Sequence, residues 1–290
     1  MKKILILIPV FNDWESLYKL INEINEIIKN FNDISINCLV VNDASTIEQP
    51  KIKKPDNFKS FKVLNMIKNK GHARCNAFGI KYVCKNEKFD YLILMDGDGE
   101  DRPVEIKDLI NSISNNPDNS IVAKRIKRSE GLFFQFLYFM HKLITFIFTG
   151  EKINFGNYSC LTKEDAVVLS SKPSLWSSYS GTVKKNIKNL NEIDSIRGTR
   201  YFGPTKMSLF KLLIHSFSII AVFKYKVFVR SLAILLILGF LNFYIGSISI
   251  LLQIVLISFC VIIFFVSLRE NRDELDKSQE NLKNIKEITH

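Results

Sequence analysis

Apolar and polar positions alternate in blocks along the first 125 residues of the chain. Short apolar runs typical of buried strands cover Lys3–Val10, Ile36–Val41, Lys62–Ile67, Tyr91–Met95 and Ser120–Ala123. Stretches with helical periodicity lie between them, at Trp14–Asn30, Ala73–Cys84 and Val104–Ser114. This succession of strands and helices predicts an α/β fold with a doubly wound, mainly parallel sheet.

The last quarter of the chain has a different pattern. The 38 residues Ser231–Leu268 contain no Asp, Glu, Lys or Arg, whereas about 20 apolar residues suffice for one bilayer crossing. We therefore expect two transmembrane helices within residues 225–268, Val227–Leu241 and Ser247–Leu268, with a tight reversal at Asn242–Gly246. One very long tilted helix is the alternative.

Basic residues flank this apolar run on both sides. Lys224, Lys226 and Arg230 precede it, and Arg269 and Arg272 follow it. Because positive residues favour the cytoplasmic side, we expect both ends of the hairpin in the cytoplasm. This predicts a multi-pass protein of the inner (plasma) membrane with a cytoplasmic domain.

The net charge of +11 is concentrated in one segment. Residues 121–230 carry 18 basic and 6 acidic side chains, whereas residues 1–120 carry 17 of each. A basic face just before a membrane hairpin is expected to meet anionic lipid. No nucleic-acid-binding motif accompanies the charge, so we expect no nucleic acid partner. The five cysteines have no C-x-x-C spacing, which indicates reduced packing residues rather than a disulfide or zinc framework.

Three further segments connect the domain to the membrane. Residues 131–150 are apolar and aromatic but are interrupted by His141 and Lys142, which favours an interfacial helix over a third span. A buried helix of the domain is the alternative. Residues 206–224 predict a second juxtamembrane amphipathic helix, and residues 269–290 predict a charged cytoplasmic tail. The tail is expected to be a solvated end, with a coiled-coil contact and a homo-oligomer left open.

Acidic side chains follow the apolar run that begins at Tyr91. Asp96, Asp98 and Glu100 occupy alternate positions directly after it, and ligands of open α/β sheets gather at the carboxyl ends of strands. Carboxylate oxygens suit Mg²⁺ or Mn²⁺. The acidic run therefore predicts a divalent cation site, with a solvated acidic turn as the alternative.

Several motifs together resemble the family 2 glycosyltransferases of GT-A fold, most closely dolichol-phosphate mannose synthase and bacterial polyprenyl-phosphate glycosyltransferases. A P-x-[YF]-N-[ED] turn is met by Pro9, Phe11, Asn12 and Asp13; a D-D-[GA]-S turn by Asn42-Asp43-Ala44-Ser45; an N-x-G loop by Asn69-Lys70-Gly71; and a D-x-D-x-[QE]-x-x-P box by Asp96–Pro103. The resemblance covers roughly residues 4–265. It implies a GT-A catalytic domain over residues 1–205, followed by the membrane hairpin.

The resemblance also implies roles for individual residues. Nucleotide-sugar contacts would come from Pro9, Phe11, Asp13, Asp43, Gly71 and Asp96. The metal would be held by Asp96, Asp98 and Glu100, and the catalytic set would be Asp98, Glu100, Arg125 and Asp101. The alternatives are structural: Asp13 could be only a helix N-cap, Asp43 could only close a turn, and Gly71 could be only a loop glycine. His72 is interpreted as a surface residue.

One departure from the family pattern bears on the acceptor. Similar enzymes carry a G-D-F-R-like run where this chain has Gly156-Asn157-Tyr158-Ser159, and the neutral amide of Asn157 cannot act as a base. A lipid phosphate is already ionised at neutral pH and needs no base, whereas a hydroxyl acceptor would need one, with Asp101 the nearest carboxylate. We expect the acceptor phosphate to meet Arg125, Arg197, Arg200 and Lys206.

The combined hypothesis is an inverting, metal-dependent glycosyltransferase. It would move a sugar from a nucleoside diphosphate donor to polyprenyl phosphate at the cytoplasmic membrane face. The alternatives are transfer to a saccharide hydroxyl and a non-catalytic membrane protein that retains the fold. The intact Asp96, Asp98 and Glu100 argue against the last, whereas Asn157 keeps it open.

Overall fold

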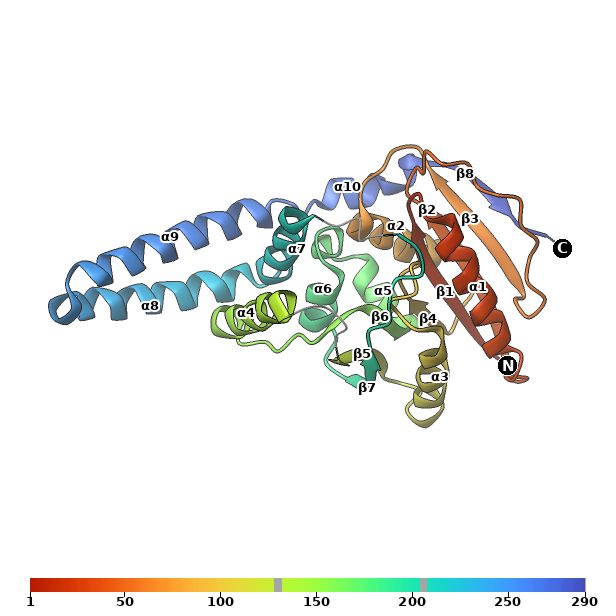
Figure 1. The fold of residues 1–290 in the computed structure, drawn as a ribbon, viewed down its shortest axis with the longest axis horizontal. Helices are drawn as coiled ribbons and strands as arrows, with labels where there is room; N and C mark the ends of the chain where they lie inside the picture. Colours follow the sequence, from red (N-terminus) through yellow and green to blue (C-terminus); the bar gives the residue numbers. More distant parts are fainter. Residues whose placement is uncertain (128–131, 204–207, 290) are drawn as a thin grey trace.

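The computed structural model describes residues 1–127, 132–203 and 208–289, and its centre is one mixed sheet of eight strands in the order β7-β5-β6-β4-β1-β2-β3-β8 (Figure 1). The strands are β1 (Lys2–Val10), β2 (Ile34–Asn42), β3 (Ser60–Met66), β4 (Tyr91–Leu94), β5 (Ser120–Lys127), β6 (Phe155–Thr162), β7 (Leu190–Ile196) and β8 (Leu282–Glu287). The five strands expected from the apolar runs are all present. Strands β6, β7 and β8 are additional.

The central strands run parallel, and the sheet becomes mixed toward both edges. β1 pairs in parallel with β2 and β4, β2 with β3, and β5 with β7. β6 is inserted antiparallel between β4 and β5, and β8 pairs antiparallel with β3. The predicted α/β class with a mainly parallel core is therefore confirmed.

Helices cover both faces of this sheet because each strand alternates its side chains between two apolar cores. On one face, Ile4, Ile6 and Ile8 of β1 pack with α1 (Trp14–Ile28) and α3 (Ile106–Asn115), and the 3-10 turn η1 (Pro103–Glu105) contacts both of these helices. On the other, Leu5 and Leu7 pack with α2 (His72–Asn86), α5 (Lys163–Ser170), the 3-10 turn η2 (Pro173–Trp176) and α6 (Tyr179–Asn186).

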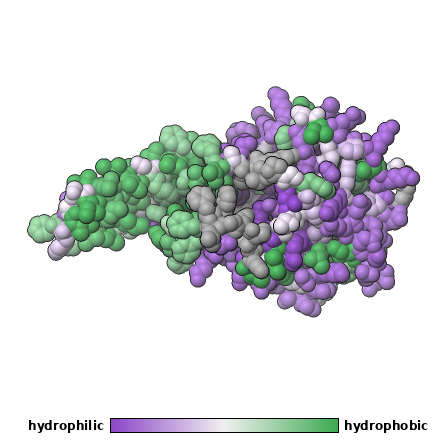
Figure 2. Space-filling model, viewed as in Figure 1, coloured by the Kyte–Doolittle hydropathy of each residue, from purple (hydrophilic) through white to green (hydrophobic). Residues whose placement is uncertain are grey.

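Two long apolar helices project from this body as a hairpin. α8 (Lys224–Ile245) and α9 (Ser247–Ser267) pack along each other, and both are long and apolar enough to cross a membrane. Gly246, with φ of +54°, makes the reversal between them. The expected hairpin is thus present, although helix α8 continues to Ile245 instead of ending at Leu241. Figure 2 shows it as a hydrophobic projection from a hydrophilic body.

Two shorter helices lie at the base of the hairpin. α4 (Leu132–Thr149) contacts α7 and α8, and its Phe136 and Phe139 are 59% and 61% exposed. These exposed rings contradict the alternative that α4 is buried in the domain. In α7 (Leu209–Ala221), Leu209, Phe210 and Leu213 are exposed, whereas Ser218–Ala221 are all buried, and the helix packs against α6 and α9.

The expectation of a solvated tail after the hairpin is wrong. The chain continues through α10 (Arg272–Asp276) and the 3-10 turn η3 (Lys277–Asn281) alongside α2 and then pairs with β3 as strand β8. Lys81 binds Asp276 at 2.5 Å, and the indole N–H of Trp176 donates to Glu274 at 3.0 Å. Figure 1 shows β8 at the edge of the sheet opposite the hairpin. The residues after the hairpin therefore complete the domain that precedes it.

Candidate active site

The residues expected to bind a nucleotide sugar lie in loops that leave one edge of the sheet. Strands β4, β1, β2 and β3 are neighbours and parallel, so the loops after their carboxyl ends meet. The loop after β4 carries Asp96, Asp98 and Glu100, and the loops after β1 and β2 carry Asp13 and Asp43. The predicted set is therefore brought to a common edge of the sheet.

Asp43 holds two of these loops together. Its side chain is 3% exposed, and its two carboxylate oxygens each accept a 2.8 Å hydrogen bond, one from the N–H of Lys70 and the other from the N–H of Gly71. Burial raises the pKa of Asp43, although both of these backbone bonds oppose the shift. Gly71 has φ of +89°, which favours glycine. The geometry thus gives Asp43 and Gly71 roles in loop structure, and direct nucleotide contact remains a prediction.

The loop after β1 is held in an unusual conformation. Asn12 has φ of +52°, and Ala44 in the neighbouring loop has φ of +56°. The side-chain oxygen of Asn12 accepts from the N–H groups of Thr46 and Ile47 at 2.8 and 3.0 Å. Positive φ at non-glycine residues concentrates at ligand sites. Phe11 in this loop is 39% exposed, whereas Pro9 is buried within β1, where it can only support the loop.

The acidic turn after β4 is organised by its own backbone. The N–H of Asp96 donates to Asp101 at 2.9 Å, and the N–H of Glu100 donates to Asp98 at 3.0 Å. Gly99 has φ of +87°, and a Cβ there would lie 2.6 Å from the ring of Tyr201. A glycine is required at this position both by conformation and by the close approach of that ring.

Two arginines cover the acidic turn. They belong to residues 197–202, here called the arginine strap, whose backbone is tied to the turn by bonds from the N–H of Gly198 to the carbonyl of Glu100 (2.8 Å) and from Tyr201 to Asp98 (2.9 Å). Arg197 pairs with the carboxylate of Glu100. Arg200 donates to Asp98 at 2.8 Å and also pairs with Asp13.

These pairs revise two expectations. Asp13 stands at the N-cap position of α1 but makes no capping hydrogen bond there, so its alternative role as a cap is wrong and its partner is Arg200. The carboxylates of the acidic turn and the arginines of the strap were expected to bind a metal and a phosphate, respectively. The structure places them in direct contact with each other.

His72, which the sequence pattern marks as a surface residue, lies in the candidate site instead. Its Nε2 lies 3.3 Å from Oδ1 of Asp96 and 2.6 Å from the amide nitrogen of Asn157, which itself donates to Asp96 at 3.2 Å. Desolvation is the largest single effect and lowers the pKa of His72, but the charge and hydrogen bond of Asp96, together with the charges of Asp98 and Asp101, raise this pKa overall. Burial likewise opposes ionisation of Asp96, yet His72 and Arg125 hold the pKa of Asp96 well below its usual range.

Asp101 and Arg125 lie beneath this cluster. Asp101 is 4% exposed, and Oδ1 of its carboxylate is 4.0 Å from Nη2 of Arg125. Burial and the neighbouring charge of Asp96 raise the pKa of Asp101 to about 7, against the opposing charge of Arg125. A Cβ at Gly156 would lie 2.5 Å from Nη2 of Arg125, so this glycine leaves space for the guanidinium.

The oxygen donors of the acidic turn suit a hard cation such as Mg²⁺ or Mn²⁺. Among residues 1–127, 132–203 and 208–289, no three His, Cys, Asp or Glu side chains converge as a ready metal cluster. The carboxylates instead hold His72, Arg197 and Arg200 as their counter-charges. The donor chemistry fits such a metal, and binding would require the carboxylates to exchange these partners. Lys206, expected to bind the acceptor phosphate, lies outside the described residues.

The sequence of this chain matches a known protein family. Residues 5–172 match the family described as Glycosyl transferase family 2. The chain belongs to this family. An uncharacterized protein of Methanocaldococcus jannaschii, MJ0544, is 24% identical over 124 residues, covering 41% of this chain and 50% of that protein. The match thus spans half the length of that curated relative.

Solved structures share the fold of this family member. Glucosyl-3-phosphoglycerate synthase from Mycobacterium tuberculosis, in complex with Mn²⁺, uridine diphosphate and phosphoglyceric acid, is 12% identical with a TM-score of 0.51, over 78% of each chain. S. aureus TarS 1-349 in complex with UDP-GlcNAc is also 12% identical with a TM-score of 0.51, over 97% of this chain and 93% of that one. At these identities the likeness shows the fold alone.

Proposed function

We propose that this family 2 glycosyltransferase transfers a sugar from a nucleoside diphosphate donor to polyprenyl phosphate at a membrane surface. The observation that carries the proposal is the meeting of an acidic turn with the arginine strap, which lies directly before α7 and the apolar hairpin. Membership of family 2 supports a nucleotide sugar as the donor. Because the strap precedes the apolar helices in the chain, we favour an anionic lipid acceptor.

The donor would lie along the loops after β1, β2 and β4. Phe11 offers an exposed ring there, and Asp13 and Asp96 offer carboxylates for ribose hydroxyls. Structures of the same fold hold uridine diphosphate with Mn²⁺ and UDP-GlcNAc, which supports a nucleotide at this edge. Asp43 and Gly71 would act by fixing the two loops that surround it.

Asp96, Asp98 and Glu100 would hold the divalent metal, Mg²⁺ or Mn²⁺. When bound, such a metal offsets the negative charge of the leaving nucleoside diphosphate. Arg197 and Arg200 now neutralise Glu100 and Asp98. The guanidinium groups of Arg197 and Arg200 are also of the kind that can grip phosphate with two parallel donors.

The acceptor chemistry follows from the absence of a base at position 157. The amide of Asn157 donates to Asp96 and lies against His72, so it takes no proton. A phosphate monoester is mostly ionised at neutral pH. Its oxygen would attack the anomeric carbon as the bond to the diphosphate oxygen breaks, which inverts that carbon. Arg125, Arg197, Arg200 and Lys206 would hold the phosphate in place.

Membrane topology supports a cytoplasmic site. Strand β8 pairs with β3, so the residues before α8 and after α9 belong to one folded domain. A chain that crosses a bilayer between them must cross it an even number of times, as two spans do. Basic residues before α8, including Lys224 and Lys226, favour the cytoplasmic side. We infer that α4 lies in the membrane surface, because its Phe136, Phe139 and Phe146 are exposed.

Transfer to a saccharide hydroxyl is the second candidate. It is favoured by Asp101, a buried carboxylate 4.0 Å from Arg125 whose pKa burial raises to about 7, because a base is most effective when its pKa lies near the working pH. The arginine strap favours the phosphate acceptor instead. A non-catalytic protein that binds the donor without transfer is the third.

Mass spectrometry of the lipid tests the proposal. The detergent-solubilised protein is incubated with polyprenyl phosphate, Mg²⁺ or Mn²⁺, and a mixture of UDP- and GDP-sugars. A gain of one sugar mass on the lipid is expected. Metal-dependent donor hydrolysis or binding without a gain on the lipid would contradict the lipid acceptor and favour one of the two alternatives.

A further inference from the structure

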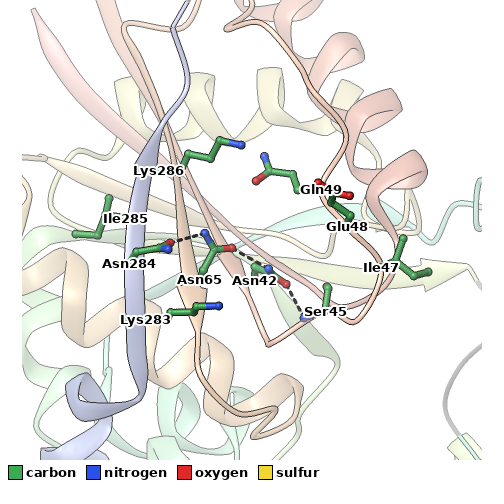
Figure 3. Close-up of a pocket in the computed structure, with 10 residues that line it drawn as sticks. All are labelled: Asn42, Ser45, Ile47, Glu48, Gln49, Asn65, Lys283, Asn284, Ile285 and Lys286. Atoms are coloured by element: carbon green, nitrogen blue, oxygen red, sulfur yellow. Dashed lines mark hydrogen bonds between the residues drawn. The ribbon is translucent and has the colours of Figure 1, made fainter.

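Three asparagine amides form a hydrogen-bonded ladder across strands β8, β3 and β2 (Figure 3). The Nδ2 group of Asn65 donates to Oδ1 of Asn284 at 2.8 Å, and the Nδ2 group of Asn42 donates to Oδ1 of Asn65 at 2.8 Å. Oδ1 of Asn42 then accepts from the backbone N–H of Ser45 at 3.0 Å. This asparagine ladder therefore runs from the strand that follows the hairpin to the loop after β2.

The ladder ends at the loops expected to hold the nucleotide. Oγ of Ser45 accepts from the N–H of Asn12 at 2.9 Å, and the N–H of Asp43 donates to the carbonyl of Val10 at 2.9 Å. Ala44, between Asp43 and Ser45, has φ of +56°. Because this conformation is unfavourable for alanine, the loop depends on its hydrogen bonds for its shape.

Asn42 is the residue at which the chain departs from the family's D-D-[GA]-S turn, which begins with Asp. An aspartate could accept from the N–H of Ser45 but has no N–H to donate to Asn65. The amide at position 42 can do both, and the structure shows it doing both. The presence of Asn instead of Asp at position 42 therefore allows a continuous chain of hydrogen bonds with Asn65 on β3 and Asn284 on β8.

The ladder also forms the floor of a polar cavity of about 590 Å³. Gln49 and Glu48 line it from the loop after β2, and Lys283 and Lys286 line it from β8. Lys286 lines this cavity and lies on the same strand as Asn284, but it makes none of the hydrogen bonds of the asparagine ladder. Substitution of Lys286 is therefore a control for substitution of Asn284.

We propose that Asn284 is a positioning residue for the donor nucleotide. It sets the orientation of the Asn65 amide, which sets that of Asn42 and so fixes the loop Asp43–Ser45. The inference rests on the proposed donor binding at this edge of the sheet. It makes the strand that follows the membrane hairpin part of the donor site, without requiring Asn284 to touch the nucleotide.

Titration calorimetry of the full-length detergent-solubilised protein with UDP and GDP, in Mn²⁺, tests the inference. Asn284→Ala is expected to raise the nucleotide Kd about three- to tenfold, the size of one hydrogen bond, with kcat at saturating donor within about twofold of the wild type. Asn284→Asp keeps an oxygen that accepts from Asn65 and should restore the wild-type Kd. Lys286→Ala should also bind like the wild type.

A second series tests whether the ladder acts as a unit. Asn42→Asp breaks the bond to Asn65 but keeps the bond from Ser45, so it should weaken binding as Asn284→Ala does. The double variant Asn42→Asp/Asn284→Ala should bind the nucleotide little more weakly than either single variant, because the effects of coupled positions are not additive. Thermal unfolding of each variant separates this from loss of fold, because the inference predicts a raised nucleotide Kd with Tm nearly unchanged, whereas a purely structural role would lower Tm and leave the Kd of the folded protein unchanged.

The outcomes separate the inference from the proposed function. If the wild type binds neither nucleotide, donor binding is wrong and the inference falls with it. If the wild type binds and Asn284→Ala binds equally well, only the inference is wrong. An equal loss in Lys286→Ala would also overturn it, because the cavity itself would then hold the ligand.

Discussion

Arg200 donates a 2.8 Å hydrogen bond to Asp98, and its second amino group pairs with Asp13, 187 positions earlier in the chain. One guanidinium thereby joins the loop after β1 to the acidic turn after β4. The same side chain is 16% exposed, so it remains accessible to a ligand that approaches the site.

Replacing Arg200 should affect the acceptor more than the donor. Arg200→Ala removes a charged two-donor group, so the KM for polyprenyl phosphate should rise about tenfold or more. The Kd for the nucleotide in Mn²⁺ should change by less than about threefold. Arg200→Lys keeps the charge but lacks the planar pair of donors, so its KM for polyprenyl phosphate should lie between those of the wild type and Arg200→Ala. Equal losses for donor and acceptor would contradict an acceptor role.

Asp98 is the second residue to test. Asp98→Ala removes a proposed metal ligand and should reduce transfer at least about hundredfold. The substitution also removes the bond from the N–H of Glu100, so Tm should fall slightly, but the protein should stay folded because Arg200 keeps Asp13 as a partner. Asp108→Ala, an exposed acid on α3, is the matched control. Metal-dependent turnover at the wild-type rate in Asp98→Ala would exclude this carboxylate from the metal site.

Position 157 distinguishes the two acceptor classes. Asn157→Asp introduces a carboxylate next to Asp96, where Asn157 now donates at 3.2 Å, so two like charges would meet. Transfer to a lipid phosphate, which needs no base, should become slower. Rates with polyprenyl phosphate and with saccharide acceptors, measured side by side, check this. A gain in transfer to a hydroxyl acceptor alone would favour the second candidate function.

The cysteines should behave as packing residues. Burial raises the pKa of the Cys38, Cys75 and Cys160 thiols, and raises that of Cys84 to about 11. A higher pKa leaves less of the reactive thiolate at a given pH. The folded protein at pH 8 should therefore be alkylated slowly at all four positions by iodoacetamide, whereas the unfolded protein should react fully. Rapid labelling of Cys75 in the folded state would show that the loop before α2, which contains Gly71, opens.

The sequence predicts the strands that are continuous apolar runs and fails for those that are not. β1 and β4 are buried along their length and stand out as such. β6 contains Gly156 and Asn157 in its first half, and β8 is an edge strand with mostly exposed residues. Neither has the alternation or the apolar content that marks a strand, so their pairing becomes visible only in three dimensions.

The sequence indicates several residues that meet in the candidate site, and their binding roles stay predictions, but it does not indicate which of them pair. The order of motifs identified Asp13, Asp98 and Arg200 individually, yet no local pattern joins residues so far apart in the chain. His72 looked like a surface residue because its neighbours in sequence give no sign of Asp96 or Asn157. The position of His72 directly after Gly71, in a loop expected to bind the nucleotide, was the available signal that it belongs to the candidate site.

The return of the chain to the sheet has a consequence for biosynthesis. β8 pairs with β3 but is translated after α8 and α9, so the edge of the sheet stays open while the hairpin is made. On the proposed topology, the hairpin enters the bilayer before the last strand reaches its partner. The asparagine ladder is completed at the same moment, so a chain that fails to insert and return would also lack the last link of that ladder. Completion of the domain would then report that insertion has taken place.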